Sequence, residues 1–214
     1  MLQGMDEFAN RRPGVYVLAA HPNWRESRVN RLLVEQAREL PGVQLADLYG
    51  RYPDYDIDVK REQALVEAAQ LLVLLHPIQW YSMPALMKLW LDEVLRYGWA
   101  YGRAGTALRG KDLWLVASTG GPEGSYHPQG YNRYFFDAFL PPYEQTAALC
   151  GMRFLPPLLF HGARSAPAAE VTAHVEVFKE RLLSYPDWPE LEELDACISC
   201  PVPEIDRPMS QEEA

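Results

Sequence analysis

The sequence contains few cysteines, no long apolar run and no signal-peptide core. Its three cysteines, Cys150, Cys197 and Cys200, are too few and too unevenly spaced for a disulfide framework, which favours a reducing compartment. The first 14 residues lack the apolar stretch of a signal peptide. No apolar run approaches the about 20 residues that span a membrane. We therefore expect a cytoplasmic protein that reaches a membrane only through a partner.

Positive charge is also scarce. The formal net charge is -9 and the isoelectric point lies near 5.1. Proteins that bind the phosphate backbone of nucleic acids need clustered lysine and arginine side chains, so we expect no nucleic-acid partner. The acidic balance is most simply explained by solubility.

Several catalytic signatures are missing as well. There is no G-x-S-x-G motif of a hydrolase nucleophile, no G-x-G-x-x-G dinucleotide fingerprint and no phosphate-binding P-loop. The five histidines show no zinc-type spacing, and we expect no metal site. The Cys197-x-x-Cys200 pair is compatible with a redox couple or half of a metal site, but an ordinary tail sequence is the simpler interpretation.

The remaining pattern alternates strands and helices in one α/β domain. A chain of 214 residues with 48% hydrophobic content suits a single domain with a sizeable core. Apolar or alternating segments predict strands at 15–20, 43–48, 71–75, 113–117 and 154–160. Helical spacing predicts helices at 28–40 with Ser27 as N-cap, at 63–69, at 85–95 with Pro84 in the first turn, at 131–149 with a break at Pro141-Pro142, and at 168–183. Such alternation indicates a parallel sheet with helices on both faces.

The domain is expected to occupy residues 15–184. Residues 1–14 form an N-terminal extension. Residues 185–214 carry five prolines and an acidic cluster, so this tail is expected to be loose or to serve as a docking arm.

Three loops follow predicted strands and meet where ligands bind in parallel α/β sheets, beyond the carboxyl ends of the strands. The loop HPNWRES leads into a helix N-terminus that suits a phosphate, with His21 and Ser27 as further donors; a plain helix cap is the alternative. The loop HPIQWYS offers Gln79, Trp80 and Tyr81 to a planar ring, unless these residues only pack at a strand end. The loop STGGPEGSYHPQG allows close backbone approach at its two glycines, although a solvent-exposed turn would use the same residues.

Together these loops resemble a known family. The strings AHPNWRESRVN, HPIQWYSMPALMKLWLDEVLRYGWAYG, STGG, GYNRY and YPDYDID are similar to flavodoxin-like NAD(P)H:quinone oxidoreductases. Within that family they most resemble the ancillary subunits of bacterial glutathione-gated potassium-efflux systems. The resemblance runs from about residue 15 to 183. It implies a flavodoxin-like three-layer sandwich with strand order 2-1-3-4-5.

The resemblance also implies a cofactor, a reaction and partners. The cofactor is FMN, with FAD as the alternative; NAD(P)H is the reductant and a quinone the acceptor. A homodimer is expected, with aromatic loops at 97–101 and 131–136 as its surface, and a potassium-efflux membrane protein is a further partner. Two alternatives to quinone turnover as the main function remain. The chain could mainly bind and activate the potassium-efflux protein, or it could be a soluble xenobiotic quinone reductase without a membrane partner.

The implied FMN site is specific in its residues. The resemblance implies that the phosphate is bound by His21, Ser27, Arg28, Val29 and Asn30. The flavin ring would be bound by Ile78, Gln79, Trp80 and Tyr81, and the other edge of the ring would be lined by Ser118, Thr119, Gly120 and Gly121. In mammalian-type quinone reductases a Tyr and a His follow the Gly-Gly loop. Tyr126 matches the Tyr, whereas Asn132 stands near the position of the His. We therefore expect Tyr126 as a catalytic residue, with His127 as a substitute if the loop folds inward.

Overall fold

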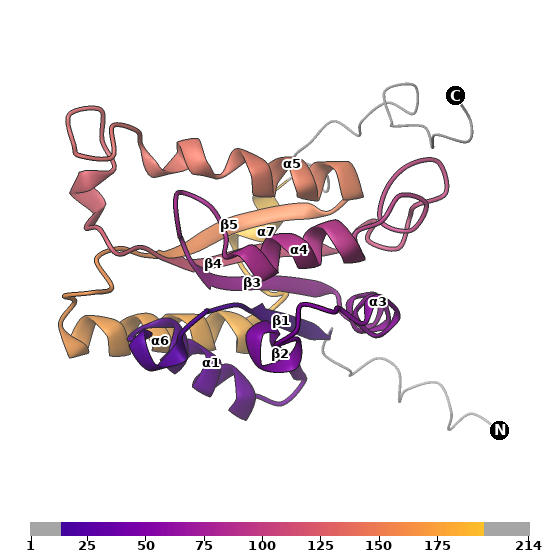
Figure 1. The fold of residues 1–214 in the computed structure, drawn as a ribbon, viewed down its shortest axis with the longest axis horizontal. Coiled ribbons are helices and arrows are strands. Elements are labelled where there is room, and N and C mark those ends of the chain that lie inside the picture. Colours follow the sequence, from indigo (N-terminus) through magenta and orange to yellow (C-terminus); the bar gives the residue numbers. More distant parts are fainter. Residues whose placement is uncertain (1–13, 195–214) are drawn as a thin grey trace.

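A five-stranded parallel sheet forms the centre of the molecule (Figure 1). The computed structural model describes residues 14–194. The strand order is β2-β1-β3-β4-β5, as expected. The strands are β1 Val15–Ala19, β2 Val43–Asp47, β3 Leu71–Pro77, β4 Asp112–Ser118 and β5 Arg153–Phe160. The central strands β1, β3 and β4 are buried almost throughout, because helices cover both faces.

The helices form one layer on each face of the sheet. Alternate residues of the strands point to opposite faces, so Tyr16 and Leu18 join one core cluster while Val15 and Val17 join the other. The first face packs against α3 Val59–Ala68, α4 Ala85–Val94 and α5 Pro141–Cys150. The second packs against α1 Asn30–Glu39 and α6 Ala168–Ser184. In Figure 1, α5 lies above the strands, α1 and α6 lie below them, and α4 is drawn across the strands.

Several helix boundaries differ from the sequence prediction. Helix α3 begins at Val59 and not at Gln63, because the Asp58 side chain caps it by accepting the Arg61 N–H at 3.1 Å. A one-turn helix, α2 Leu48–Arg51, was not predicted.

The prolines at 141–142 begin a helix and do not interrupt one. Pro141 is the first residue of α5, where its missing N–H costs no hydrogen bond. The residues before it form turns and the short 3-10 helix η3 Phe136–Phe139. The predicted single helix over 131–149 is therefore wrong for its first half.

The start of the expected loose tail is packed against the domain. Tyr185, Trp188 and Leu191 are 4%, 3% and 9% exposed, and the short helix α7 Glu190–Glu193 follows. The Tyr185 hydroxyl donates to Asp112 Oδ2 at 2.7 Å, and the Trp188 ring lies 4.9 Å from that of Trp114. The domain thus continues to residue 194, ten residues beyond the predicted boundary. The remaining tail, with Cys197 and Cys200, and the extension at 1–13 lie outside the described residues.

Strand β5 is an edge strand with an irregular register. Trp114 pairs with Leu155 and Val116 with Leu158, so Pro156 and Pro157 both face one residue of β4. Neither proline has a backbone N–H, which restricts such residues to edges and bulges.

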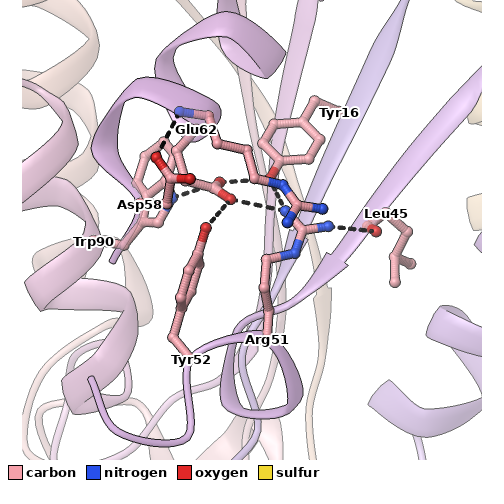
Figure 2. Close-up of polar contacts among 8 residues, drawn as sticks. Tyr16, Leu45, Arg51, Tyr52, Asp58, Glu62 and Trp90 are labelled. Atoms are coloured by element: carbon pink, nitrogen blue, oxygen red, sulfur yellow. Dashed lines mark hydrogen bonds and ion pairs between the residues drawn. The ribbon is translucent and has the colours of Figure 1, made fainter. Parts of the chain in front are cut away.

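A buried carboxylate ties β1, α2, α3 and α4 together (Figure 2). Glu62 is fully buried, and each of its oxygens accepts two hydrogen bonds. Oε2 accepts from the Tyr16 hydroxyl at 2.6 Å and Trp90 Nε1 at 2.9 Å, while Oε1 accepts from the Tyr52 hydroxyl at 2.7 Å and Arg51 Nη1 at 2.8 Å. Burial acts to raise the Glu62 pKa, but the four donors together hold that pKa below its usual value. Glu62 is therefore ionised at neutral pH.

Candidate functional site

Two adjoining cavities open at the carboxyl ends of the strands. The smaller, of about 220 Å³, adjoins the N-terminal end of α1 and is called the phosphate pocket below. The larger, of about 720 Å³, lies between the β3–α4 loop and the residues after β4 and is called the ring pocket. Ile78, Gln79, Gly120 and Arg164 line both. The cavities therefore form one continuous site, at the position predicted from strand polarity.

The phosphate pocket is lined by backbone donors. Within residues 14–194 the N–H groups of Arg28, Val29 and Asn30 have no hydrogen-bond partner. Ser27 Oγ accepts the Arg31 N–H at 3.1 Å. The Ser27 side chain therefore caps α1, although it lies two residues before Val29, the residue that directly precedes the helix. Free N–H groups at the positive end of a helix dipole suit an anion.

A buried amide next to this pocket lacks a partner. Asn30 is 1% exposed, and neither its Oδ1 nor its Nδ2 has a hydrogen bond in the described part of the chain. Buried polar side chains are almost always hydrogen-bonded. Asn30 thus marks a partner that this chain alone does not supply, and the donor set fits the phosphate of FMN.

Two of the side chains expected at the phosphate, those of His21 and Arg28, make hydrogen bonds within the protein. The His21 ring accepts the Asn23 N–H at Nδ1 (3.1 Å), and burial lowers the His21 pKa. The Arg28 guanidinium donates to the backbone oxygens of Arg164 and Ala166. Both residues line the pocket. His21 Nδ1 and the two terminal nitrogens of Arg28 have protein partners, whereas His21 Nε2 has none among residues 14–194.

The β3–α4 loop holds two consecutive residues in the left-handed region. Trp80 has φ 48° and Tyr81 φ 66°, at the tip of a hairpin in which Gln79 and Ser82 exchange backbone hydrogen bonds of 2.9 and 3.1 Å. Asn and Gly are the residues normally found at such a turn. Strain of this kind gathers at functional sites. The N–H groups of Trp80 and Tyr81 have no partner among the described residues, so they remain available to a ligand in the ring pocket.

The Gly120-Gly121 turn forms the opposite wall. A Cβ at Gly120 would lie 3.0 Å from Arg164 Nε, and one at Gly121 would lie 2.9 Å from Ser125 Oγ. Only glycine fits without displacing these side chains. The N–H groups of both glycines are free within the described chain. Ser118 and Thr119, which precede them, are buried and line the phosphate pocket.

Tyr126 and His127 differ in their placement. Tyr126 lines the ring pocket, and burial raises its pKa although a hydrogen bond with the Thr119 side chain acts in the opposite direction. The phenol is therefore protonated at neutral pH and can donate a hydrogen bond. His127 lines neither pocket: its ring lies 5.0 Å from that of Phe135, and its Nδ1 accepts the Gln129 N–H. The loop does not fold His127 inward.

Asn132 takes part in the ring pocket as a fixed amide. Its Nδ2 donates to Ser125 Oγ at 3.0 Å, and its Oδ1 accepts from the Tyr81 hydroxyl at 3.4 Å. This amide connects the two walls of the pocket.

Several residues near the site were not predicted, among them Tyr131, His161 and Arg164. Tyr131 and Arg164 line the ring pocket, and His161 lies beside Tyr126 with ring centroids 5.3 Å apart. His161 Nδ1 lies 3.0 Å from Thr119 Oγ1. Both His161 and Arg164 follow the carboxyl end of β5, so the rule that selected the other loops would have indicated them.

Exposed aromatic side chains gather at the site. Trp80, Tyr131, Tyr134 and Phe135 are 93%, 79%, 62% and 56% exposed. Phe136, which follows them, is buried, and its ring contacts that of Tyr126. A cluster of this kind is typical of a surface that binds a partner or ligand.

Comparison with known proteins identifies the family. A family model described as a flavodoxin-like fold matches residues 14–182. The chain belongs to this flavodoxin-like family. It is 42% identical over 171 residues to the ancillary protein KefF of the glutathione-regulated potassium-efflux system of Citrobacter koseri, which covers 80% of this chain and 96% of that protein. The predicted resemblance is thus confirmed.

Two solved structures resemble this flavodoxin-like chain. The general stress protein 14 of Treponema denticola, solved in complex with FMN, is 36% identical with a TM-score of 0.72 over 82% of this chain and 98% of that one. An NADPH-quinone reductase from P. pentosaceus is 25% identical with a TM-score of 0.71 over 78% and 96%.

Two features are absent from residues 14–194. None of the helices there combines the length and apolar character needed to cross a bilayer. No group of three or more metal-ligating side chains was found in the same range.

Proposed function

We propose that this chain is an FMN-dependent oxidoreductase of the NAD(P)H dehydrogenase (quinone) type, which carries two electrons from NAD(P)H to a quinone-type acceptor. One observation carries the proposal: a pocket of free helix N-terminal N–H groups adjoins a ring pocket whose two walls offer four more free N–H groups. The FMN complex of the Treponema denticola relative supports FMN as the occupant. The named quinone reductase supports the acceptor class.

Each residue has a defined part in this reaction. Bound FMN supplies the redox chemistry, by which NAD(P)H, a quinone and a proton become NAD(P)⁺ and a hydroquinone. The N–H groups of Arg28, Val29 and Asn30 would hold the phosphate, and those of Trp80, Tyr81, Gly120 and Gly121 would bind the ring and stabilise negative charge on it. Tyr126 donates a hydrogen bond to the acceptor oxygen. We propose that nicotinamide and quinone occupy the ring pocket, a cavity of about 720 Å³, in turn.

A visible spectrum tests the cofactor. Purified protein incubated with FMN and desalted is expected to show the two flavin bands above 350 nm, about one FMN per chain. Chromatography of the released flavin separates FMN from the alternative FAD. Anaerobic addition of NADH or NADPH should bleach the bands, and a quinone should restore them. A protein that stays colourless after incubation contradicts the proposal.

We further propose a homodimer whose interface includes the aromatic residues around the ring pocket. Trp80 at 93% and Tyr131 at 79% exposure place large apolar surface in water, which a second copy would cover. Sedimentation equilibrium should give twice the chain mass of 24.4 kDa. The double variant Trp80→Ser, Tyr131→Ser should shift the chain to a monomer, whereas a wild-type monomer with full activity excludes the dimer.

A second function is favoured by the relatives themselves. KefF is named as an ancillary protein of a potassium-efflux system, and we propose that this chain also docks on such a membrane protein from the cytoplasm. Co-purification with a potassium-efflux membrane protein of the same organism, and potassium efflux measured with and without this chain, test that role. A Tyr126→Phe variant that loses quinone turnover but still supports efflux would separate the two functions. A soluble xenobiotic reductase predicts quinone turnover with no such partner.

A further inference from the structure

We propose that Arg164, and not Arg28, supplies the guanidinium that binds the phosphate of the cofactor. The inference rests on the proposed FMN site. It reverses the role that the family resemblance gives to Arg28, whose position at the helix N-terminus suggests a phosphate ligand.

Arg28 is engaged in holding a loop. Its Nη1 donates to the Arg164 backbone oxygen, and its Nη2 donates to the Ala166 oxygen at 3.0 Å. These bonds join the start of α1 to the β5–α6 loop, more than 130 residues away in sequence. Turning the Arg28 guanidinium toward a phosphate would leave both carbonyls without their donors. Arg28 is therefore a positioning residue, because it fixes the backbone of the loop that carries Arg164.

Arg164 has a free guanidinium at the junction of the two pockets. Its side chain lines both cavities, and within residues 14–194 it has no hydrogen-bond or ion-pair partner. Its Nε would lie 3.0 Å, and its Cζ 3.6 Å, from a Cβ placed on Gly120. The absence of a side chain at Gly120 is what leaves room for the arginine beside the ligand.

The other titratable side chains that line the phosphate pocket do not offer a free cation. Burial lowers the pKa of His21, which leaves that ring neutral at pH 7. Glu26 also lines the pocket, and its carboxylate repels a phosphate dianion. Of the side chains lining this pocket, Arg164 is thus the cation whose donors are free to pair with the ligand, and a guanidinium matches a phosphate in two-pronged geometry.

This arrangement predicts selection for a phosphorylated flavin over riboflavin. We would measure the dissociation constants of FMN and riboflavin by quenching of flavin fluorescence, for the wild type, Arg164→Gln and Glu26→Gln. Arg164→Gln should weaken FMN binding about tenfold, because it removes a charged hydrogen bond at a partly exposed site. Riboflavin binding should not change. Glu26→Gln should tighten FMN binding a few-fold and also leave riboflavin unchanged.

The Arg28→Gln variant is the matched control. Because Arg28 positions the loop, this variant should weaken FMN and riboflavin by similar factors and lower the melting temperature, whereas Arg164→Gln should leave the melting temperature unchanged. Equal losses for both flavins in Arg164→Gln, or a loss restricted to FMN in Arg28→Gln, would overturn the inference while leaving FMN binding intact. A wild type that binds neither flavin would overturn the proposed function together with it.

Discussion

Replacement of Glu62 by Gln should destabilise the protein strongly, because the buried network in Figure 2 is built around a carboxylate. Each carboxylate oxygen accepts two hydrogen bonds, from Tyr16 and Trp90 on one side and from Tyr52 and Arg51 on the other. Glutamine keeps one accepting oxygen and turns an NH₂ group toward the other two donors. Breaking a buried ion pair by removing one partner typically costs about 3–5 kcal/mol of unfolding free energy.

That cost is large enough to measure by two methods. For a domain of this size about 1 kcal/mol corresponds to about 2–4 °C in melting temperature, so a fall of about 6–20 °C is expected. Urea titration followed by circular dichroism gives the free energy directly. Glu35→Gln is the matched control. The side chains of Glu35 and of its ion-pair partner Arg31 are both about half exposed, so the unfolding free energy should fall by less than about 1 kcal/mol. A Glu62→Gln variant within about 1 kcal/mol of the wild type would refute this reasoning.

The same network predicts a pH dependence. The folded-state pKa of Glu62 lies below the ordinary value of 4.5, so its stabilisation is complete above that value and is lost as the pH falls through the folded pKa. The difference in unfolding free energy between the wild type and Glu62→Gln should therefore be constant near neutrality and shrink below about pH 4.5. A difference that grows in acid would contradict the sign.

Three further predictions concern other parts of the molecule. Burial lowers the pKa of His76 from 6.5 to about 4. The unfolding free energy should therefore fall by about 3 kcal/mol because of His76 as the pH drops through that window. His76→Gln should flatten the dependence of this free energy on pH, measured by urea titration. Trp188→Ala should lower the unfolding free energy by about 3–5 kcal/mol in the same assay, because Trp188 is only 3% exposed. A change below about 1 kcal/mol would support the predicted domain boundary at residue 184. The double variant Trp80→Asn, Tyr81→Gly should raise the melting temperature, because it relieves about 1–3 kcal/mol of backbone strain per residue. The same variant should weaken FMN binding, measured by flavin fluorescence. A fall in melting temperature would show that the turn is not strained.

The sheet could be predicted from the sequence because its central strands are buried on both faces. A run such as Leu71–Pro77 is apolar almost throughout. Helix starts were harder. The first turn of α3 contains Lys60, Arg61 and Glu62, so it lacks the apolar periodicity that marks a helix, although the cap at Asp58 was present in the sequence.

The site was predictable at the level of loops and less so for individual side chains. Strand polarity placed Gln79, Gly120 and Tyr126 together, because it depends only on the order of elements. The direction of His127 depends on packing against Phe135, which nothing in the local sequence reports. Likewise, the engagement of Arg28 with a loop more than 130 residues away is a tertiary contact that a motif cannot reveal.

The proline pair in β5 limits how this protein can associate with itself. An open edge of a sheet can recruit a strand from another molecule by exchanging backbone hydrogen bonds, which leads to fibres or swapped dimers. Pro156, exposed in the middle of that edge, and Pro157 beside it have no N–H to offer, and the bulge they form breaks the register on which a new strand would be laid. Growth of the sheet is therefore blocked at β5, and contacts between copies at that edge are left to side chains.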